Sequence, residues 1–191
     1  MRGTCAGPGA HDTLMALAGG TRLPRHHSGS CMTPRSLVLL LAMLALLALD
    51  QGSKAWVRAD IPMYRASVLV PQLLDLTHVE NRGVSFSFLG TVGDSVRVPL
   101  LVGVSLAALA LLGWYWRRHR HELGVFGHLA FVFIVPGAAG NLIDRLRYGT
   151  VTDFLHFRFY DTSFFVNNLA DIFISVGVVA YVLGVLHHLR R

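Results

Sequence analysis

Four apolar stretches constrain the fold more than any other feature of this sequence. They cover residues 36–57, 98–116, 124–143 and 169–186. Each is close to the roughly 20 residues that a helix needs to cross the hydrocarbon core of a bilayer. The chain is 53% hydrophobic and 15% charged, whereas charged residues make up about a quarter of an ordinary soluble domain. The sequence therefore predicts a membrane protein, mainly α, built as a four-helix transmembrane bundle.

The distribution of charge predicts the orientation of these helices. The chain has 17 Lys and Arg against 11 Asp and Glu, an excess that is also found in nucleic-acid-binding proteins. If the N-terminus is cytoplasmic, the cytoplasmic segments carry nine arginines and two acidic residues, and the outer segments carry eight basic and nine acidic residues. This asymmetry follows the positive-inside rule. We therefore expect both termini in the cytoplasm and no nucleic acid partner.

Residues 1–31 differ from the rest of the chain. They are rich in Gly, Ser, His and Arg without sustained periodicity, which is the composition of a disordered segment. Met32 precedes a short basic start to the first apolar stretch, so we expect this leader to be dispensable or to lie before the native start. Residues 32–191 are expected to form a single membrane-embedded domain. Both cysteines precede the first span, on the reducing side, so no structural disulfide is expected.

The third apolar stretch leads directly into polar and ionisable residues. Asn141 and Arg145 come first, four residues apart on one helical face, and Asp153 follows. Asp171 opens the fourth apolar stretch. Ionisable side chains at this depth cost free energy and usually serve function. If the two stretches form neighbouring helices, Asp153 and Asp171 meet at one face of the membrane, and the sequence predicts an aspartyl pair.

Two further polar pairs have competing interpretations. Asp50 and Lys54 are four residues apart on one face of the first helix and can form an ion pair. Either the lysine extends to the outer headgroups, or the pair positions a substrate near the later carboxylates. Asn168 and Asp171 lie one turn apart. Either Asn168 is simply the N-cap of the fourth helix, or the two residues belong to a functional site with Asp153.

The segment between the first two spans predicts a small β-sheet. Residues 68–70 form a short apolar run with two β-branched valines, and apolar residues alternate with serines over residues 84–88. This alternation is typical of a strand, and Asn81-Arg82-Gly83 is expected to form a turn before it. We expect the sheet to lie on the outer membrane surface. The aromatic residues of the second outer loop, residues 154–165, are expected at the level of the headgroups.

The motifs of several enzyme classes are missing from the sequence. It contains no His-Glu-x-x-His zinc motif and no Gly-x-Ser-x-Gly nucleophile motif. Carboxylates remain as the candidate catalytic groups, so neither a metal nor another cofactor is expected. Two adjacent aspartates share one proton because both cannot ionise cheaply. One member can then take a proton from water while the other donates a proton to the carbonyl under attack.

Four blocks of this sequence carry a specific similarity. They are DQGSK at residues 50–54, ENRGVSFSFL at 80–89, GNLIDRLRYGTVTDF at 140–154 and NLAD at 168–171. In their order and spacing the chain resembles the lipoprotein signal peptidase family, also called signal peptidase II. The leader has no counterpart in the family pattern. The resemblance implies an aspartic endopeptidase that removes the signal peptide from diacylglyceryl-modified prolipoproteins by cutting before the lipidated cysteine.

The resemblance also implies a role for individual residues. Asp153 and Asp171 would be the catalytic aspartates, with no metal site. Six residues would line the substrate pocket: Asp50, Lys54, Asn81, Asn141, Arg145 and Asn168. Of these, Arg145 and Asn81 would hold the substrate backbone, whereas Asn141 and Asn168 would orient the aspartates. The family fold implies a β-cradle outside the membrane, with a short mobile flap over residues 60–65.

The family further implies a location and a set of partners. The chain would be a multi-pass protein of the bacterial cytoplasmic membrane, with its active site at the extracytoplasmic face. Its partners would be a lipidated prolipoprotein and membrane lipid. Because four spans suffice to enclose a site, we expect the chain to act as a monomer. A proton-coupled transporter is the main alternative, but its site would lie near the membrane midplane between internal repeats. A structural assembly factor is the third possibility and would tolerate loss of either aspartate.

Overall fold

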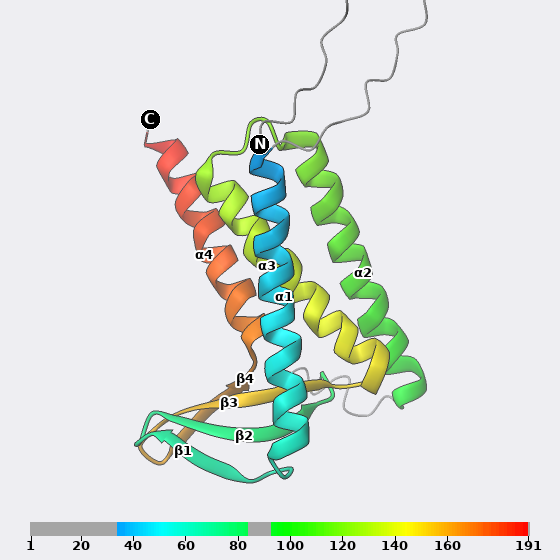
Figure 1. Cartoon of the computed structure of the whole chain (residues 1–191), viewed down its shortest axis with the longest axis vertical. Coiled ribbons are helices and arrows are strands. Elements are labelled where there is room, and N and C mark those ends of the chain that lie inside the picture. Colours follow the sequence, from blue (N-terminus) through cyan, green and yellow to red (C-terminus); the bar gives the residue numbers. More distant parts are fainter. Residues whose placement is uncertain (1–33, 84–92, 191) are drawn as a thin grey trace, which may run out of the picture. The chain divides into compact units, whose positions relative to one another are not determined.

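The computed structural model describes residues 34–83 and 93–190. Within them lie four helices: α1 (Pro34–Asp60), α2 (Asp94–His119), α3 (Val125–Tyr148) and α4 (Leu169–Leu189). All four are long and apolar enough to cross a membrane (Figure 1). The predicted fold class, a four-helix membrane bundle with a small sheet, is confirmed. The leader at residues 1–31 and the strand expected at residues 84–88 lie outside the described residues.

Helix α3 is the centre of the bundle and packs against each of the other three helices. Its approach to α4 depends on small residues. A methyl group added to Gly137 would lie 2.6 Å from the carbonyl oxygen of Ala170. One added to Gly177 on α4 would lie 2.9 Å from the carbonyl oxygen of Ala130. Only glycine therefore allows the two backbones to come this close, as is common between membrane helices.

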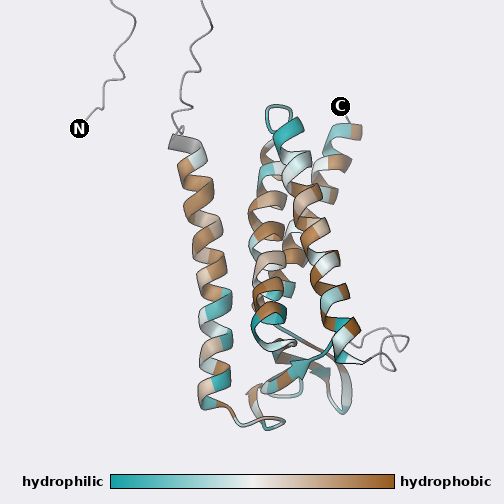
Figure 2. Cartoon of the chain, turned by 90° about the vertical axis from the view of Figure 1, so that its right-hand side faces the viewer, coloured by the Kyte–Doolittle hydropathy of each residue, from teal (hydrophilic) through white to brown (hydrophobic). Residues whose placement is uncertain are grey.

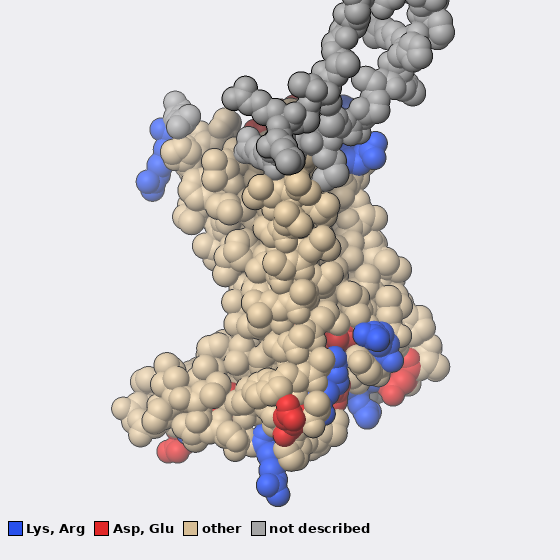
Figure 3. Space-filling model, viewed as in Figure 1, with Lys and Arg blue, Asp and Glu red and all other residues tan. Residues whose placement is uncertain are grey.

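The surface of the bundle is suited to lipid. The helices are apolar along their middle sections, and the half of α1 nearest the sheet is more hydrophilic (Figure 2). On the face shown in Figure 3, charged side chains of the described residues gather at the two ends of the bundle. Apolar side chains that are more than half exposed occur on all four described helices, and examples are Leu41, Val104, Leu111, Leu146 and Val179.

The sheet lies at one end of the bundle and is antiparallel, in the order β1-β2-β3-β4 (Figure 1). Its strands are β1 (Ala66–Val70), β2 (Leu74–Asn81), β3 (Val151–Phe159) and β4 (Thr162–Asn167). Half of the sheet therefore comes from the segment that we expected to be an aromatic-rich loop, and that expectation is wrong. Residues 155–159 alternate between apolar and polar side chains, which is the strand pattern. The turn that joins β3 to β4 has no glycine, and Tyr160 adopts its positive φ of 53°.

The β3–β4 hairpin connects α3 to α4. Helix α3 ends at Tyr148, and Gly149 caps it with a φ of 73°, a left-handed conformation that glycine adopts without strain. The chain then enters β3, returns along β4 and starts α4 at Leu169, with Asn168 as its N-cap. This path brings the start of β3 beside the first turn of α4.

Candidate active site

The polar residues singled out in the sequence gather where the helices meet the sheet. Six polar side chains there belong to residues that are at most 1% exposed: Asp50, Lys54, Asp144, Thr152, Asp153 and Asn168. Burying charged groups is costly unless each has a partner. The partners of these side chains therefore define the geometry of the site.

Asp153 lies on β3 with both carboxyl oxygens occupied. Its Oδ1 accepts a hydrogen bond from Asn168 Nδ2 at 2.6 Å, and its Oδ2 accepts one from Asn81 Nδ2 at 2.8 Å. Burial raises the pKa of Asp153 to about 6. The bonds from Asn81 and Asn168 act against this rise, and the nearby carboxylate of Asp171 adds to it. Asp153 therefore changes protonation state close to neutral pH.

Asp171 lies in the first turn of α4 and is held by two asparagines. Its Oδ1 accepts a hydrogen bond from Asn141 Nδ2 at 2.8 Å, and its backbone N–H donates to Asn168 Oδ1 at 3.0 Å. Asn168 is thus the N-cap of α4, as one interpretation of the sequence predicted. With its amide nitrogen it also holds Asp153, so this single residue connects the two aspartates.

Lys54 is the cation at the centre of the site. Its Nζ lies 3.0 Å from Asp50 Oδ2 and 3.2 Å from Asp144 Oδ2, and it donates to Asn141 Oδ1 at 2.9 Å. The side chain is completely buried, so the interpretation that it extends to the headgroups is wrong. The ammonium has three hydrogens, and three acceptors inside the protein take them. Because Lys54 binds the oxygen of Asn141, the amide nitrogen of Asn141 faces Asp171.

Asp50 connects α1 to the helix that carries Asp171. Its Oδ1 accepts a hydrogen bond from the backbone N–H of Ala170 at 2.9 Å. A carboxylate at a helix N-terminus satisfies a free N–H group and interacts favourably with the helix dipole. A side chain at Gly140 would collide with the Asp50 carboxylate. Asp50 and Lys54 are therefore placed to hold α4 in position, behind the two aspartates.

Asp144 is a residue of the site to which the sequence analysis gave no role. It is completely buried, and its Oδ2 accepts a hydrogen bond from Thr152 N at 3.3 Å in addition to pairing with Lys54. A signal for it exists in the sequence. Asn141 and Asp144 are three residues apart and therefore share a helical face.

Arg145 differs from the other cations of the site. It is only half-buried, and its Nη1 donates to the backbone oxygen of Asn141 at 3.5 Å. Among the residues that the structure describes, none forms an ion pair with it. Most of the guanidinium donors are therefore available to a ligand.

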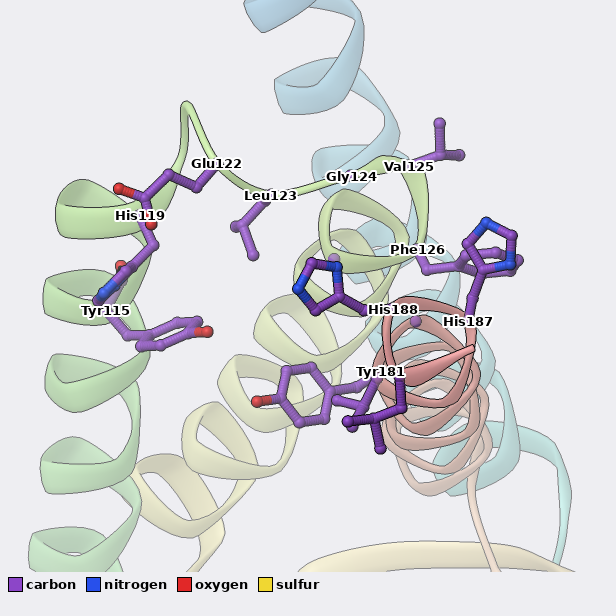
Figure 4. Close-up of a pocket in the computed structure, with 14 residues that line it drawn as sticks. Tyr115, His119, Glu122, Leu123, Gly124, Val125, Phe126, Tyr181, His187 and His188 are labelled. Carbon is purple, nitrogen blue, oxygen red and sulfur yellow. Dashed lines mark hydrogen bonds between the residues drawn. The ribbon is translucent and has the colours of Figure 1, made fainter. Parts of the chain in front are cut away.

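One cavity of the described residues is far from this site. It has a volume of about 740 Å³ and lies at the opposite end of the bundle, between the ends of α2 and α4 (Figure 4). Tyr115 and Tyr181 point toward one another across it. Three histidines and one acidic residue contribute to its lining: His119, His187, His188 and Glu122. None of the predicted site residues lines it.

Two solved chains share this fold. Both are described as bacterial membrane enzymes crystallised by the in meso method, at 1.9 and 2.3 Å resolution. The TM-scores are 0.69 and 0.67, and each solved chain is 22% identical to this protein. Each match covers 78% of this protein. The matches cover 92% and 88% of the solved chains. The bundle and its sheet thus have the same fold as these two solved chains.

Sequence similarity then identifies the family. The profile described as "Signal peptidase (SPase) II" matches residues 42–187. A lipoprotein signal peptidase of Sinorhizobium fredii is 40% identical over 157 residues, which are 82% of this chain and 91% of that protein. Another, of Allorhizobium ampelinum, is 38% identical over 157 residues, which are 82% of this chain and 93% of that protein. The chain therefore belongs to the signal peptidase II family and is an aspartic-type peptidase. The resemblance noted in the sequence is confirmed, and the transporter and assembly-factor alternatives fall away.

Proposed function

We propose that this chain removes the signal peptide from diacylglyceryl-modified prolipoproteins, cutting before the lipidated cysteine with a water held between Asp153 and Asp171. The observation that carries the proposal is the double role of Asn168. Its side chain donates to the carboxyl of Asp153 and accepts from the backbone of Asp171. Two aspartates that are 18 residues apart are thereby fixed around one buried amide.

The two aspartates have different surroundings, and this suggests different tasks. Asp153 is 1% exposed and its pKa is raised to about 6 by burial, so it is suited to carry the shared proton. Asp171 is only half-buried. In the proposed reaction, Asp171 takes a proton from the water as the water oxygen attacks the scissile carbonyl carbon, and Asp153 protonates the carbonyl oxygen. The proton on Asp171 then passes to the leaving amine as the C–N bond breaks, while one hydroxyl of the diol intermediate returns its proton to Asp153 and becomes the carbonyl oxygen of the product.

The substrate is held by groups beside the aspartates. The free donors of Arg145 are proposed to bind a carbonyl oxygen of the substrate backbone, together with Asn81. Asp50 and Lys54 line the rear of the site and keep α4 in place. No metal or cofactor takes part in the proposed reaction, so a chelator should leave the rate unchanged.

The surroundings of the site support a location and an assembly state. The charge asymmetry of the sequence supports cytoplasmic termini and an active site at the extracytoplasmic face of the bacterial cytoplasmic membrane. The lipid anchor of the substrate and the surrounding membrane lipids would then lie beside the apolar surfaces of the helices. We further propose that residues 32–191 form one peptidase domain that acts as a monomer. One chain supplies both aspartates and all their described partners.

The substrate class is tested with a matched pair of precursors. The purified chain is placed in liposomes with a diacylglyceryl-modified prolipoprotein, or with the same precursor carrying serine in place of the lipidated cysteine. Mass spectrometry of the products should show a single cut before the modified cysteine and no cut in the serine precursor. Cleavage of both precursors at equal rates, or a cut at another bond, would contradict the proposal.

A further inference from the structure

A charged cluster beside the active site has no part in the proposed reaction. It is built around Glu80 on β2, whose register partner on β3 is Thr152. Glu80 Oε1 accepts a hydrogen bond from the Thr152 hydroxyl at 3.2 Å, and Oε2 accepts one from the Thr150 hydroxyl. The next residues along the two strands, Asn81 and Asp153, form the hydrogen bond of the active site. Since side chains alternate between the faces of a sheet, the Glu80 cluster supports the site from behind.

Thr152 links the sheet to helices α1 and α3 by hydrogen bonds. Its hydroxyl oxygen accepts a hydrogen bond from Arg58 Nη1 on α1 at 2.8 Å. Its backbone N–H donates to Asp144 on α3. A hydroxyl has a single hydrogen. Because Arg58 occupies the oxygen as a donor, that hydrogen is free to point at Glu80, which fixes the direction of the whole chain of bonds.

His78 connects the same carboxylate to the link between α1 and β1. Its Nδ1 lies 2.8 Å from the backbone oxygen of Ile61, and its Nε2 lies 3.1 Å from Glu80 Oε1. Its own carbonyl accepts the N–H of Tyr64 at 2.9 Å. The two ring nitrogens of His78 thus face two hydrogen-bonding groups, the backbone carbonyl of Ile61 and the carboxyl of Glu80.

The hydrogen bonds around Glu80 favour its ionised form. Burial by itself raises the pKa of a carboxyl, but here the hydrogen bonds from Thr150, His78 and Thr152 outweigh it, and the pKa of Glu80 is lowered. Glu80 is therefore ionised and accepts from every neighbour. Its side chain is 17% exposed, and that of His78 is 7% exposed, so the pair is largely shielded from water.

We propose that Glu80 is a positioning residue for Asp153. Through Thr152 it holds β3 against α1 and α3 at the level where Asn81 and Asn168 reach the Asp153 carboxyl. Through His78 it holds the link at residues 61–65 to the same carboxylate. This inference rests on the proposed role of Asp153 as a catalytic residue.

The opposite end of the same two strands provides a matched control. Asp75 on β2 is also buried and faces β3, where its register partner is His156. It lies 3.1 Å from Arg158 Nε and 3.6 Å from His156 Nδ1. None of these residues adjoins Asp153 or bonds to it. Asp75→Asn and Glu80→Gln therefore remove one buried negative charge each from the same strand pair, and only Glu80→Gln acts beside the active site.

The test compares thermal unfolding in detergent with steady-state cleavage over a range of pH. Both variants should lower Tm. Glu80→Gln should also lower kcat by about 10- to 100-fold, since small displacements of a catalytic group have effects of this size, and should leave KM nearly unchanged. It should move the alkaline limb of the pH profile upward, because Asp153 acts in its protonated form and the loosened bonds from Asn81 and Asn168 are those that lower its pKa. The charged groups around Asp153, which are Lys54, Arg145 and Asp171, stay the same.

A second pair of variants keeps the test decisive if Glu80→Gln does not fold. Thr152→Val removes the hydroxyl and should lower kcat as Glu80→Gln does, whereas Thr152→Ser keeps the hydroxyl and should restore kcat. The double variant Glu80→Gln/Thr152→Val should be no worse than either single variant, since both break one chain of bonds.

Two outcomes would overturn the inference. One is that Glu80→Gln, or Thr152→Val in its place, retains the kcat and the alkaline limb of the parent. The other is that Asp75→Asn loses as much kcat as Glu80→Gln. Asp153→Asn is measured alongside: if that variant stays active, the proposed function fails. A neutral Glu80→Gln beside an inactive Asp153→Asn refutes the positioning role alone.

Discussion

Most charged side chains of the candidate site are buried, whereas those at the other end of the helix bundle are exposed. At the sheet end, Asp50, Lys54, Asp144 and Asp153 are at most 1% exposed, and each has a polar partner inside the protein. At the other end, charged and histidine side chains line an open cavity or face solvent (Figure 4). Exposed charge beyond a span serves orientation in the membrane. Charge that is desolvated and fully partnered is costly, and such sites are commonly functional.

The sharpest test of this contrast is the loss of either aspartate. Asp153→Asn or Asp171→Asn should lower cleavage of a lipidated precursor by about 10⁴-fold or more, since residues that act as a unit cannot replace one another. Each variant should still fold, because asparagine has nearly the same shape. The check is single-turnover cleavage in liposomes, with the Tm of each variant as the control for folding. Parent-like rates in both variants would rule out the proposed mechanism.

The next largest effect is expected at Lys54. Lys54→Met leaves the Asp50 and Asp144 carboxylates buried without their shared cation, which should cost about 3–5 kcal/mol of unfolding free energy. Chemical denaturation in detergent measures this loss. An equally apolar change at the other end, His188→Leu, is the control and should cost far less. If Lys54→Met and His188→Leu lower the unfolding free energy equally, the two ends of the bundle do not differ in how much their charged groups contribute to stability.

The pH dependence of stability should report the burial of Asp153. Its pKa is raised from 3.8 to about 6, so between these values the folded protein binds more protons than the unfolded chain. The contribution of this group to the unfolding free energy therefore falls as pH rises from about 4 to about 6, and it stays low above that range. Asp153→Asn should lack this slope when Tm is measured across the range. A slope that is unchanged in the variant would assign it to another group.

The smallest effect is expected at the far cavity. His119→Ala and His188→Ala should change the rate of cleavage by less than about twofold, as surface changes away from a site usually do. Steady-state kinetics in liposomes provide the measurement. A large loss of activity in either variant would show that the two ends do not differ in function as they differ in burial.

The spans and the main site residues were accessible from the sequence for a simple reason. A run of about 20 apolar residues has few folds open to it, and carboxylates or amides at its ends stand out against that background. Asp153, Asp171, Asn141 and Asn168 were found in this way, and the structure brings them together. Their catalytic roles stay a prediction.

Other features were hidden because they depend on partners distant in sequence. Asp50 and Lys54 have the same spacing in the sequence whether their ion pair is exposed or buried. In the structure Lys54 is buried with a second partner, Asp144, which lies 90 residues further along the chain. Strands β3 and β4 were missed because their turn at Tyr160 has no glycine or asparagine to mark it. Aromatic residues also suit both a strand and a membrane interface.

The central claim is that one water is held between Asp153 and Asp171. It is tested most directly by an experimental structure at high resolution, grown from a lipid phase with a non-cleavable peptide analogue bound. A water, or the analogue's hydroxyl in its place, is expected within about 2.6–3.2 Å of both carboxyl groups. If the carboxyl groups of Asp153 and Asp171 are too far apart to bind one oxygen atom, or point away from each other, the proposed mechanism is contradicted.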